Sequence, residues 1–345
     1  MRNTSGGASA NLDLLRSVAV LLVLLDHLTR HHHYDRLGSL GYFGVLLFFV
    51  HTALVLMYSM QRSHLGGFAL VKDFYIRRAF RIYPLSILAV VTALALHLHA
   101  DGRGLAANSW PSTLEILSNL TLVQNLTYSK SIIGPLWSLP LEVQMYLLLP
   151  FLFLWRQRAV WLLLLLWLAC GLLGHFPETV PALGWFTLLL YIPNFLPGVM
   201  AFTLSKKEFL PSYCWPIFLF CLATMFLADP SRRMGAGECL LLGLTIPLFK
   251  EITFRPLTFV ANRIATYSYG IYLGHSFFIW FALTKHNNWV LFWLMWIAIP
   301  PALYYLIERP AIEVGKKLAK RFAQPAIPAR VYKPQEVEIP SFSTL

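Results

Sequence analysis

The sequence has few charged residues and lacks several motifs that are typical of soluble enzymes. Asp, Glu, Lys and Arg make up 13% of its 345 residues, whereas 57% are hydrophobic, and the mean hydropathy is +0.59. A chain with so little polar surface cannot cover a soluble globule. G-x-x-x-x-G-K-[ST], G-x-G-x-x-G, H-E-x-x-H and G-x-S-x-G are all missing. Their absence removes the usual sequence support for nucleotide hydrolysis, a dinucleotide-binding fold, a zinc peptidase and an α/β-hydrolase.

Cysteine is also scarce, with four residues in the chain. They lie in or beside apolar runs and lack the short paired spacing of a zinc site. We interpret them as buried free thiols and predict no metal centre. They are Cys170, Cys214, Cys221 and Cys239.

The net charge of +12 could suggest a nucleic-acid partner. The basic residues are spread between apolar runs, however, and no basic face is interleaved with aromatic residues for base stacking. We therefore expect no nucleic-acid partner. The charge is better explained by membrane topology and by contact with anionic lipid headgroups.

The apolar runs predict an all-α, polytopic membrane protein with about ten transmembrane helices. A helix needs about 20 residues to cross about 30 Å of hydrocarbon. The segment between spans three and four is too polar for a confident span, and we expect a re-entrant or interfacial element there. The predicted spans are residues 12–29, 42–61, 79–99, 139–155, 159–175, 184–204, 211–228, 237–250, 264–284 and 289–308.

Basic residues set the orientation of these spans. Lys and Arg cluster after spans two, four, six and eight and after the last span, and with ten spans all these loops lie on one side. Because cytoplasmic loops carry an excess of Lys and Arg, both termini are predicted to be cytoplasmic. The chain then divides into a cytoplasmic segment at 1–11, a membrane domain at 12–310, and a basic, then disordered tail at 311–345.

Within the first span, the stretch of residues 12–27 carries four ionisable residues: Asp13, Arg16, Asp26 and His27. Ionisable groups inside a membrane segment are candidates for function. At about 100° per residue, Arg16 and His27 fall within about 20° of each other on one helical face. Arg16 then lies toward the cytoplasm and His27 toward the outer side. His27 is either a general base for a hydroxyl or part of an interfacial polar cluster.

Three arginines follow at the start of span three. Arg77, Arg78 and Arg81 stand at i, i+1 and i+4, so the first and last share a helical face. Guanidinium groups bind phosphate oxygens in paired geometry, so the cluster could hold a pyrophosphate or a 3′-phosphate. The alternative is a cytoplasmic anchor of the kind that every multispanning protein has.

Further polar residues lie within the apolar runs. Glu142 stands in the first turn of span four, where the helix dipole favours a carboxylate. We expect it at a depth similar to that of His27, and a carboxylate beside an imidazole can fix its tautomer. It could equally be a structural capping acid. His51, Thr52 and His275 could line the bundle interior or simply bond a neighbouring helix.

Five stretches, in this order, resemble motifs of one known family. The first is LDLLRSVAVLLVLLDH, in which an Arg is followed by ten residues and a His, preceded by Leu-Asp. The second is GVLLFFVHTALVL, which resembles G-V-x-x-F-F-V-x-S-G. It departs from that pattern at Thr52, where Ser is usual, and at Ala53, where Gly is usual.

The other three stretches lie further along the chain. The third is RRAFRIYP, which resembles R-R-x-x-R followed by an aliphatic residue, an aromatic residue and Pro. The fourth is LWSLPLEVQMYLLLP, which resembles L-W-S-L-x-x-E-x-x-x-Y-x-x-x-P. The fifth combines SYGIYLGHSF and IERP in the late helices. Together, over about residues 12–310, the chain resembles the acyltransferase family 3 of integral membrane O-acyltransferases.

This resemblance implies an activity and its substrates. An acyl group, usually acetyl, would pass from cytoplasmic acyl-CoA, with acetyl-CoA as the expected donor, to a hydroxyl of a saccharide or of a lipid-linked glycan. A multi-pass protein of the bacterial inner membrane is expected.

The resemblance also implies roles for individual residues. It places Arg77, Arg78 and Arg81 on acyl-CoA-binding positions. We expect Arg16 to be a structural or donor-channel residue that pairs with Asp13. His27 would be the catalytic base and Glu142 would orient its ring. The residues expected to line the substrate channel are Asp13, Thr52, Tyr146 and His275.

Two other functions fit the sequence. A transporter or flippase of a polar lipid or sugar would also have about ten spans with intramembrane charges and basic inner loops. It would have no need for acyl-CoA. A non-catalytic membrane partner of a glycan assembly complex would tolerate replacement of His27 and Glu142.

Overall fold

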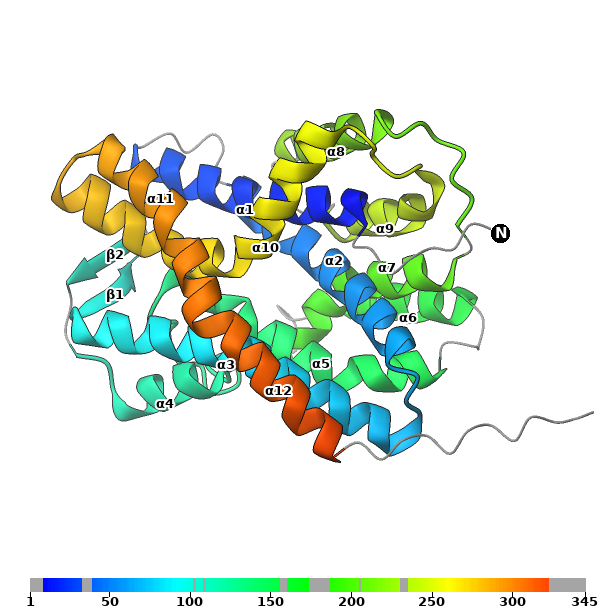
Figure 1. The fold of residues 1–345 in the computed structure, drawn as a ribbon, viewed down its shortest axis with the longest axis horizontal. Helices are drawn as coiled ribbons and strands as arrows, with labels where there is room; N and C mark the ends of the chain where they lie inside the picture. The colour runs from blue at the N-terminus through cyan, green and yellow to red at the C-terminus, as the bar shows by residue number, and fades with distance from the viewer. Residues whose placement is uncertain are drawn as a thin grey trace, which may run out of the picture.

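The computed structural model describes residues 9–32, 39–101, 104–107, 110–155, 160–173, 187–204, 206–229 and 235–322. Within these ranges the chain is helical apart from one short hairpin (Figure 1). The elements are α1 (Ala10–His31), α2 (Leu40–Ser63), α3 (Gly67–Ala95), β1 (Leu98–Asp101), β2 (Gly104–Ala107), α4 (Thr113–Thr121), η2 (Gly134–Trp137), α5 (Leu139–Trp155), α6 (Val160–Leu173), α7 (Thr187–Thr203), α8 (Cys214–Ala228), α9 (Gly235–Thr245), η4 (Ile246–Leu248), α10 (Arg255–Phe278), η5 (Ile279–Lys285), α11 (Trp289–Leu303), η6 (Tyr304–Glu308) and α12 (Arg309–Phe322).

Four helical segments are long and apolar enough to cross a membrane: Leu40–Ser63, Gly67–Ala95, Gly134–Leu154 and Trp289–Phe322. Shorter apolar helices accompany them. The chain is therefore a helical membrane protein, as predicted. The count of ten spans and the cytoplasmic placement of the termini stay predictions.

The boundaries differ from the predicted spans at three places. Helix α3 begins at Gly67, well before the predicted start of span three at residue 79, so the arginine cluster lies in the middle of a continuous helix rather than at its start. Strands β1 and β2 pair antiparallel, with Leu98 opposite Ala107, which the all-α prediction omitted. The basic start of the predicted tail is helical in α12, and the rest of the tail lies outside the described residues.

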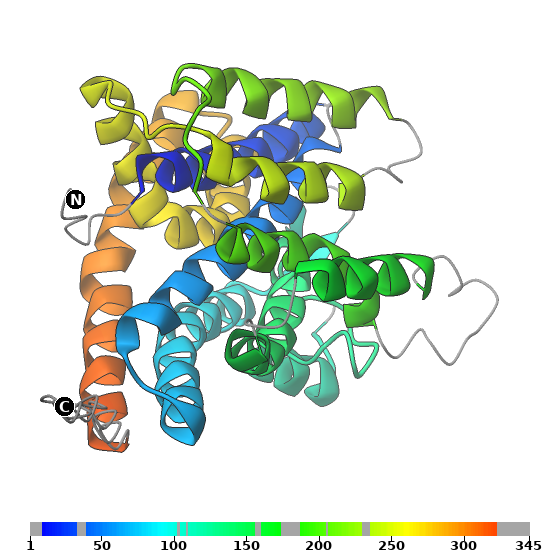
Figure 2. The same ribbon diagram turned by 90° about the vertical axis from the view of Figure 1, so that its right-hand side faces the viewer.

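The helices pack around α1 and α2. Helix α1 lies against α2 and α10, α2 lies against α7, and α7 lies against α9. On another side α12 packs along α3, and Figure 2 shows α12 running down one edge of the molecule. The interior that these helices enclose holds large, fully buried side chains, among them Phe43, Phe195, Trp215, Phe226 and Phe292.

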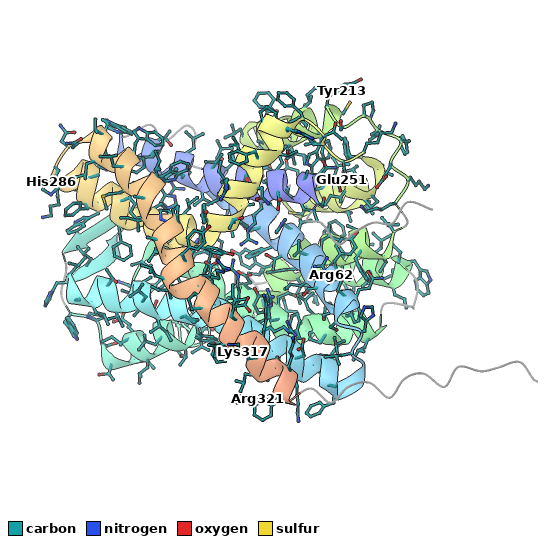
Figure 3. The ribbon with its side chains drawn as sticks, in the orientation of Figure 1. Arg62, Tyr213, Glu251, His286, Lys317 and Arg321 are labelled. Carbon is teal, nitrogen blue, oxygen red and sulfur yellow. The ribbon has the colours of Figure 1, made fainter. Side chains whose placement is uncertain are left out.

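Contacts at the two ends of α1 fix its direction in the bundle. At its amino end, Ser9 donates a hydrogen bond to Glu251 over 2.7 Å. At its carboxyl end, the ring of His32 stacks on Trp289 with the centroids 5.3 Å apart. Figure 3 labels Glu251 and also His286, which precedes Trp289 by three residues, and these two residues lie well apart on the molecule. Residues early and late in α1 therefore lie in different parts of the bundle.

A glycine allows α7 to approach α2 closely. A Cβ built on Gly198 would come within 2.8 Å of the Ala53 Cβ and 2.9 Å of the Leu54 backbone nitrogen, and it would overlap the Val50 carbonyl oxygen. Small residues at such crossings let membrane helices pack through backbone contact. An added methyl group at this position would force the two helices apart.

We expect Gly198→Ala to lower the apparent unfolding temperature of the purified protein in detergent. Overpacking of this kind destabilises by about 1–3 kcal/mol. Gly237→Ala in α9 is the matched control, because a Cβ there meets nothing within 4 Å. Alanine favours a helix over glycine, so the control should hold or gain stability. Equal losses in both variants would contradict the proposed close packing.

Candidate active site

Two residues of α1 mark two polar regions of the interior. Arg16 and His27 lie about 16 Å apart along the helix axis, at about 1.5 Å per residue. Arg16 faces a cavity between the helices, and His27 faces the carboxyl half of α10. The two residues therefore cannot contact one small group together.

The cavity at Arg16 has a volume of about 80 Å³. Side chains from α1, α2, α3, α5 and α10 line it, and they include three arginines, several hydroxyl groups and aromatic rings. We call it the arginine cavity. Its polar and aromatic lining consists of Arg16, Phe48, Phe49, His51, Thr52, Arg78, Arg81, Ser138, Glu142, Tyr146, Ser268, Tyr269 and Tyr272.

Polar partners from several helices hold the arginines of this cavity. The Arg16 Nε donates to the Ser268 Oγ over 2.6 Å. Arg81 forms an ion pair with Glu308, whose side chain is 1% exposed, and its guanidinium lies 5.3 Å from the centre of the Tyr269 ring. Glu308 lies in η6, a segment of π-helix, which often marks a functional position.

Glu142 faces this cavity, and the expectation that it lies beside His27 is wrong. Tyr146, one turn later on α5, donates a hydrogen bond to the Glu142 carboxylate. Among the described residues, the ring of His27 contacts Val23, Asp26 and His275 instead. Glu142 therefore belongs with the arginines.

The reason is that α5 begins inside the bundle rather than at its surface. The turn before it, η2, is buried, and Tyr272 of α10 hydrogen-bonds both the Pro135 carbonyl oxygen, at 3.0 Å, and the Ser138 hydroxyl, at 2.7 Å. Gln124 donates to the Leu136 carbonyl oxygen from the segment before it, over 2.8 Å. The chain thus enters the bundle before α5 starts, which places Glu142 at the depth of the arginines.

His27 is held by its own helix. Its Nδ1 lies 2.9 Å from the Val23 carbonyl oxygen. Because a carbonyl oxygen only accepts hydrogen bonds, Nδ1 donates here and carries the ring proton. Nε2 of the neutral ring is then an acceptor. The neighbouring Asp26 is buried and pairs with Arg30 at 3.0 Å, while the His27 side chain is 31% exposed.

His275 lies against His27, and it links the two polar regions. The centroids of the two imidazole rings are 4.6 Å apart, in an edge-to-face arrangement. The ring centroid of His275 also lies 6.1 Å from that of Tyr272, which lines the arginine cavity. A line of polar side chains thus runs along α10 from His27 toward Glu142.

The other predicted site residues are divided between these regions. Thr52 and Tyr146 line the arginine cavity, as a substrate-channel role would require. Arg77 turns away from it and pairs with Asp73 at 2.7 Å, so the three arginines do not form one site. Asp13 accepts a hydrogen bond from Asn262 over 2.9 Å, and its expected pairing with Arg16 is wrong.

Several residues of the site were missed by reasoning from sequence. Ser268 and Tyr272 were not predicted, whereas His275 was expected to line the substrate channel. The three residues lie at i, i+4 and i+7, a spacing that places them on one helical face and could have revealed the polar line. Glu308 is an acidic residue at the end of an apolar run, which is itself a signal of function. His51 was noted as polar but not assigned to the site, where it lines the arginine cavity.

Comparison with known proteins gives the same family as the motifs. A family model described as an acyltransferase domain matches residues 9–306. The chain is 26% identical over 318 residues to the peptidoglycan O-acetyltransferase OatA of Listeria monocytogenes, covering 77% of this chain and 48% of that protein. It is 25% identical over 310 residues to the putative peptidoglycan O-acetyltransferase YrhL of Bacillus subtilis, covering 76% and 47%.

The chain spans about half the length of these curated relatives. No solved structure matches it. The family match extends from the amino end of α1 into η6, so it takes in both His27 and the arginine cavity. On this match, the chain belongs to the acyltransferase family 3 of integral membrane proteins.

Proposed function

We propose that this protein is a membrane O-acyltransferase that moves an acyl group, acetyl in the first instance, from acyl-CoA to a hydroxyl of a saccharide. Two curated relatives are named for O-acetylation of peptidoglycan, so a glycan is the first acceptor class to test. We place the protein in the inner membrane of a bacterium, with both termini and the arginine cavity toward the cytoplasm, where acyl-CoA is made.

The observation that carries this proposal is the tautomer of His27. The hydrogen bond to the Val23 carbonyl oxygen keeps the ring proton on Nδ1, so Nε2 is available as a base. The ring is partly exposed, so a hydroxyl can reach it. A positioned imidazole of this kind is the most frequent general base in enzymes.

The charges and the size of the arginine cavity support the binding of acyl-CoA, the proposed donor. Arg16, Arg78 and Arg81 bring three positive charges to it, against the two negative charges of Glu142 and Glu308. Ligand sites usually measure about 300–1,000 Å³, so a cavity of about 80 Å³ suits an acyl-thioester end or a single phosphate rather than a whole nucleotide. The nucleotide of acyl-CoA would lie outside it.

The reaction needs one base and no added oxidant or reductant. Nε2 of His27 takes the proton of the acceptor hydroxyl while the hydroxyl oxygen attacks the thioester carbonyl carbon. The tetrahedral intermediate then expels the CoA thiolate, which takes the proton back from His27. The products are an O-acyl ester and CoA thiol. An acyl-His27 intermediate would give the same products in two steps.

We expect His27→Ala to lower acetyl transfer by about 10²–10⁴-fold, the usual contribution of a general base. The measurement is thiol release from acetyl-CoA in the presence of peptidoglycan fragments, together with detection of the acetyl ester by mass spectrometry. His31→Ala, one helical turn further along α1, is the matched control. A His27→Ala protein that is folded and transfers acetyl at the wild-type rate would exclude His27 as the base.

We expect Arg78→Met to raise the KM for acetyl-CoA by about tenfold or more, because a hydrogen bond to a charged group is lost. Arg77→Met removes the same charge from the next position of α3, but Arg77 pairs with Asp73 outside the cavity. Its effect on KM should be small. Equal increases in the two variants would indicate a general attraction of basic residues for CoA rather than a site at the arginine cavity.

A third test separates stability from activity at the Arg81–Glu308 pair. Arg81→Met leaves Glu308 buried without its partner, which typically costs about 3–5 kcal/mol of stability. Adding Glu308→Leu should restore the unfolding temperature in detergent, because a hydrophobic replacement of a buried pair is often neutral. Acetyl transfer should stay low in the double variant. Recovery of both stability and transfer would assign the pair a purely structural role.

A further inference from the structure

An apolar groove lies between α3, α10 with η5, and α11, separate from the arginine cavity. Its volume is about 250 Å³. Leu, Phe, Ile and Met side chains form most of its lining, Thr92 contributes the single hydroxyl group, and none of the described residues along it is charged. A cavity of about 150 Å³ with such a lining stays dry and accepts a six-carbon ring, so this groove has room for about ten carbon atoms. It therefore suits a single hydrocarbon chain.

The groove is closed at one end and open at the other. At the closed end, Leu85 of α3 and Leu273 of α10 are 2% and 1% exposed. At the open end, Leu96 and Phe281 are 47% and 40% exposed. Strand β2 lies against η5 near this end (Figure 1). A chain can thus enter from the η5 end and run inward between α3 and α10.

Basic side chains stand at the open end. The Nζ of Lys285 lies 5.7 Å from the centre of the Trp280 ring, and the centre of the His286 ring lies 4.7 Å from that of Phe281. Both aromatic rings line the groove, and both basic residues are exposed. Lysine binds phosphate as a compact point charge. An amphiphile with a phosphate head and an apolar chain therefore matches both the mouth of the groove and its interior.

The open end of the groove lies near the carboxyl end of α1, which carries His27. Lys285 precedes Trp289 by four residues, and the ring of Trp289 stacks on the ring of His32 with the centroids 5.3 Å apart. His32 follows His27 by five residues. A head group bound at the mouth of the groove would thus lie at the same end of the bundle as the proposed base.

This end is remote from the basic tail of the chain. Figure 3 shows His286 well apart from Lys317 and Arg321, which stand in the segment predicted to be cytoplasmic. In the proposed reaction, acyl-CoA comes from the cytoplasmic side. The position of the mouth therefore favours a ligand that belongs to the acceptor.

The place of the groove around α10 also favours the acceptor over the donor. At about 100° per residue, Phe277 in the groove lies about 160° around the helix from His275, which neighbours His27. The acyl chain of a donor is bonded directly to the carbonyl carbon that reacts, so that chain would begin on the His27 side of α10. A saccharide on a lipid phosphate is longer and can pass the end of α10. A phospholipid fits less well, because it has two chains.

We propose that the groove binds the single hydrocarbon chain of a lipid phosphate that carries the acceptor saccharide. The chain lies between α3, α10 and α11, the phosphate pairs with Lys285, and the saccharide reaches His27 around the end of α10. No bond is made or broken in the groove. This inference rests on the proposed acyl transfer to a saccharide, and it adds the form in which the acceptor is presented.

The test compares two acceptors that differ in the length of one chain. They are the decyl and the methyl phosphodiesters of glucose 1-phosphate, with acetyl-CoA as donor and the protein in nanodiscs of phosphatidylcholine. For the wild-type protein, kcat/KM should be about tenfold or more higher for the decyl compound, because its chain is held in an apolar site. Equal values of kcat/KM for the two acceptors would overturn the inference.

A groove-filling variant separates the groove from the bilayer, which also attracts the decyl chain. Ala89→Phe places a ring in the groove at a buried position and should lower the decyl-to-methyl ratio of kcat/KM about tenfold. Val91→Phe is the matched control, because Val91 is 49% exposed on the same helix outside the groove, and it should keep the wild-type ratio. Leu88→Trp, at a partly exposed position of the lining, repeats the test if Ala89→Phe does not fold.

Two results of this comparison would contradict the groove as the binding site. An unchanged ratio in Ala89→Phe and in Leu88→Trp would mean that the bilayer alone concentrates the decyl compound. An equal loss of kcat/KM for both acceptors would mean that the groove serves the fold or holds a structural lipid. Either result overturns the inference.

Lys285→Gln tests the phosphate contact. The ratio of kcat/KM for the decyl phosphodiester to that for neutral decyl glucoside should fall about two- to fivefold, as expected when an exposed charge pair is lost. Lys317→Gln, at an exposed position of α12, is the matched control and should keep the ratio. An unchanged ratio in Lys285→Gln would overturn the placement of the phosphate.

Occupation of the groove by the donor would give another result. With the methyl phosphodiester as acceptor, the ratio of decanoyl transfer from decanoyl-CoA to acetyl transfer from acetyl-CoA should be the same in the wild-type protein and in Ala89→Phe. A lower ratio in Ala89→Phe would assign the groove to the acyl chain of the donor and would overturn the inference.

Failure of the proposed function is distinguishable from failure of this inference. A wild-type protein that acetylates none of these acceptors contradicts acyl transfer to a saccharide, and the groove is then tested by photolabelling. A decyl phosphodiester with a diazirine at the end of its chain would be irradiated with the protein, and labelled peptides would be identified by mass spectrometry. Labelling of α3, α10 or α11 that Ala89→Phe abolishes supports the groove as a lipid-phosphate site. Labelling that Ala89→Phe leaves unchanged overturns it.

Discussion

The burial of charge inside an apolar helix bundle is the constraint on which the rest of the structure depends. Arg16, Arg78, Arg81, Glu142 and Glu308 all lie in or beside one cavity, although they come from α1, α3, α5 and η6. A charge buried without a partner costs several kcal/mol, so each of these helices must keep its place relative to the others. Helices that are distant in the sequence are thereby held in fixed positions relative to one another.

Stability alone does not explain why the bundle keeps these charges. A buried ion pair is often no more stabilising than a well-packed hydrophobic pair of similar volume. The cluster also carries three positive and two negative groups, so one positive charge is not balanced within it. An anionic group such as a phosphate would complete that balance. The arrangement therefore fits a binding site better than a structural one.

Reasoning from sequence found the residues of this site but not all of their neighbours. Spacing along one helix placed Arg16 and His27 correctly on α1, because helical geometry is local. It could not show that α5 begins within the bundle, since that follows from the buried turn before it, and so Glu142 was assigned to the wrong region. Arg77 was misassigned for a different reason: Asp73 stands four residues earlier on α3, and this local ion pair was overlooked although its spacing can be read from the sequence.

The two regions of the site are joined by α10 rather than by α1. Along α1, about 16 Å separate the arginine cavity from His27. Ser268, Tyr272 and His275 of α10 lie alongside that interval. Tyr272 lines the cavity, and its ring is a neighbour of the His275 ring. In the proposed reaction, a donor anchored at the arginines would extend along this face of α10 to bring its acyl group to His27. The acceptor is not required to pass the arginines at all. In this proposal the donor and the acceptor would approach from different sides and meet where α10 faces His27.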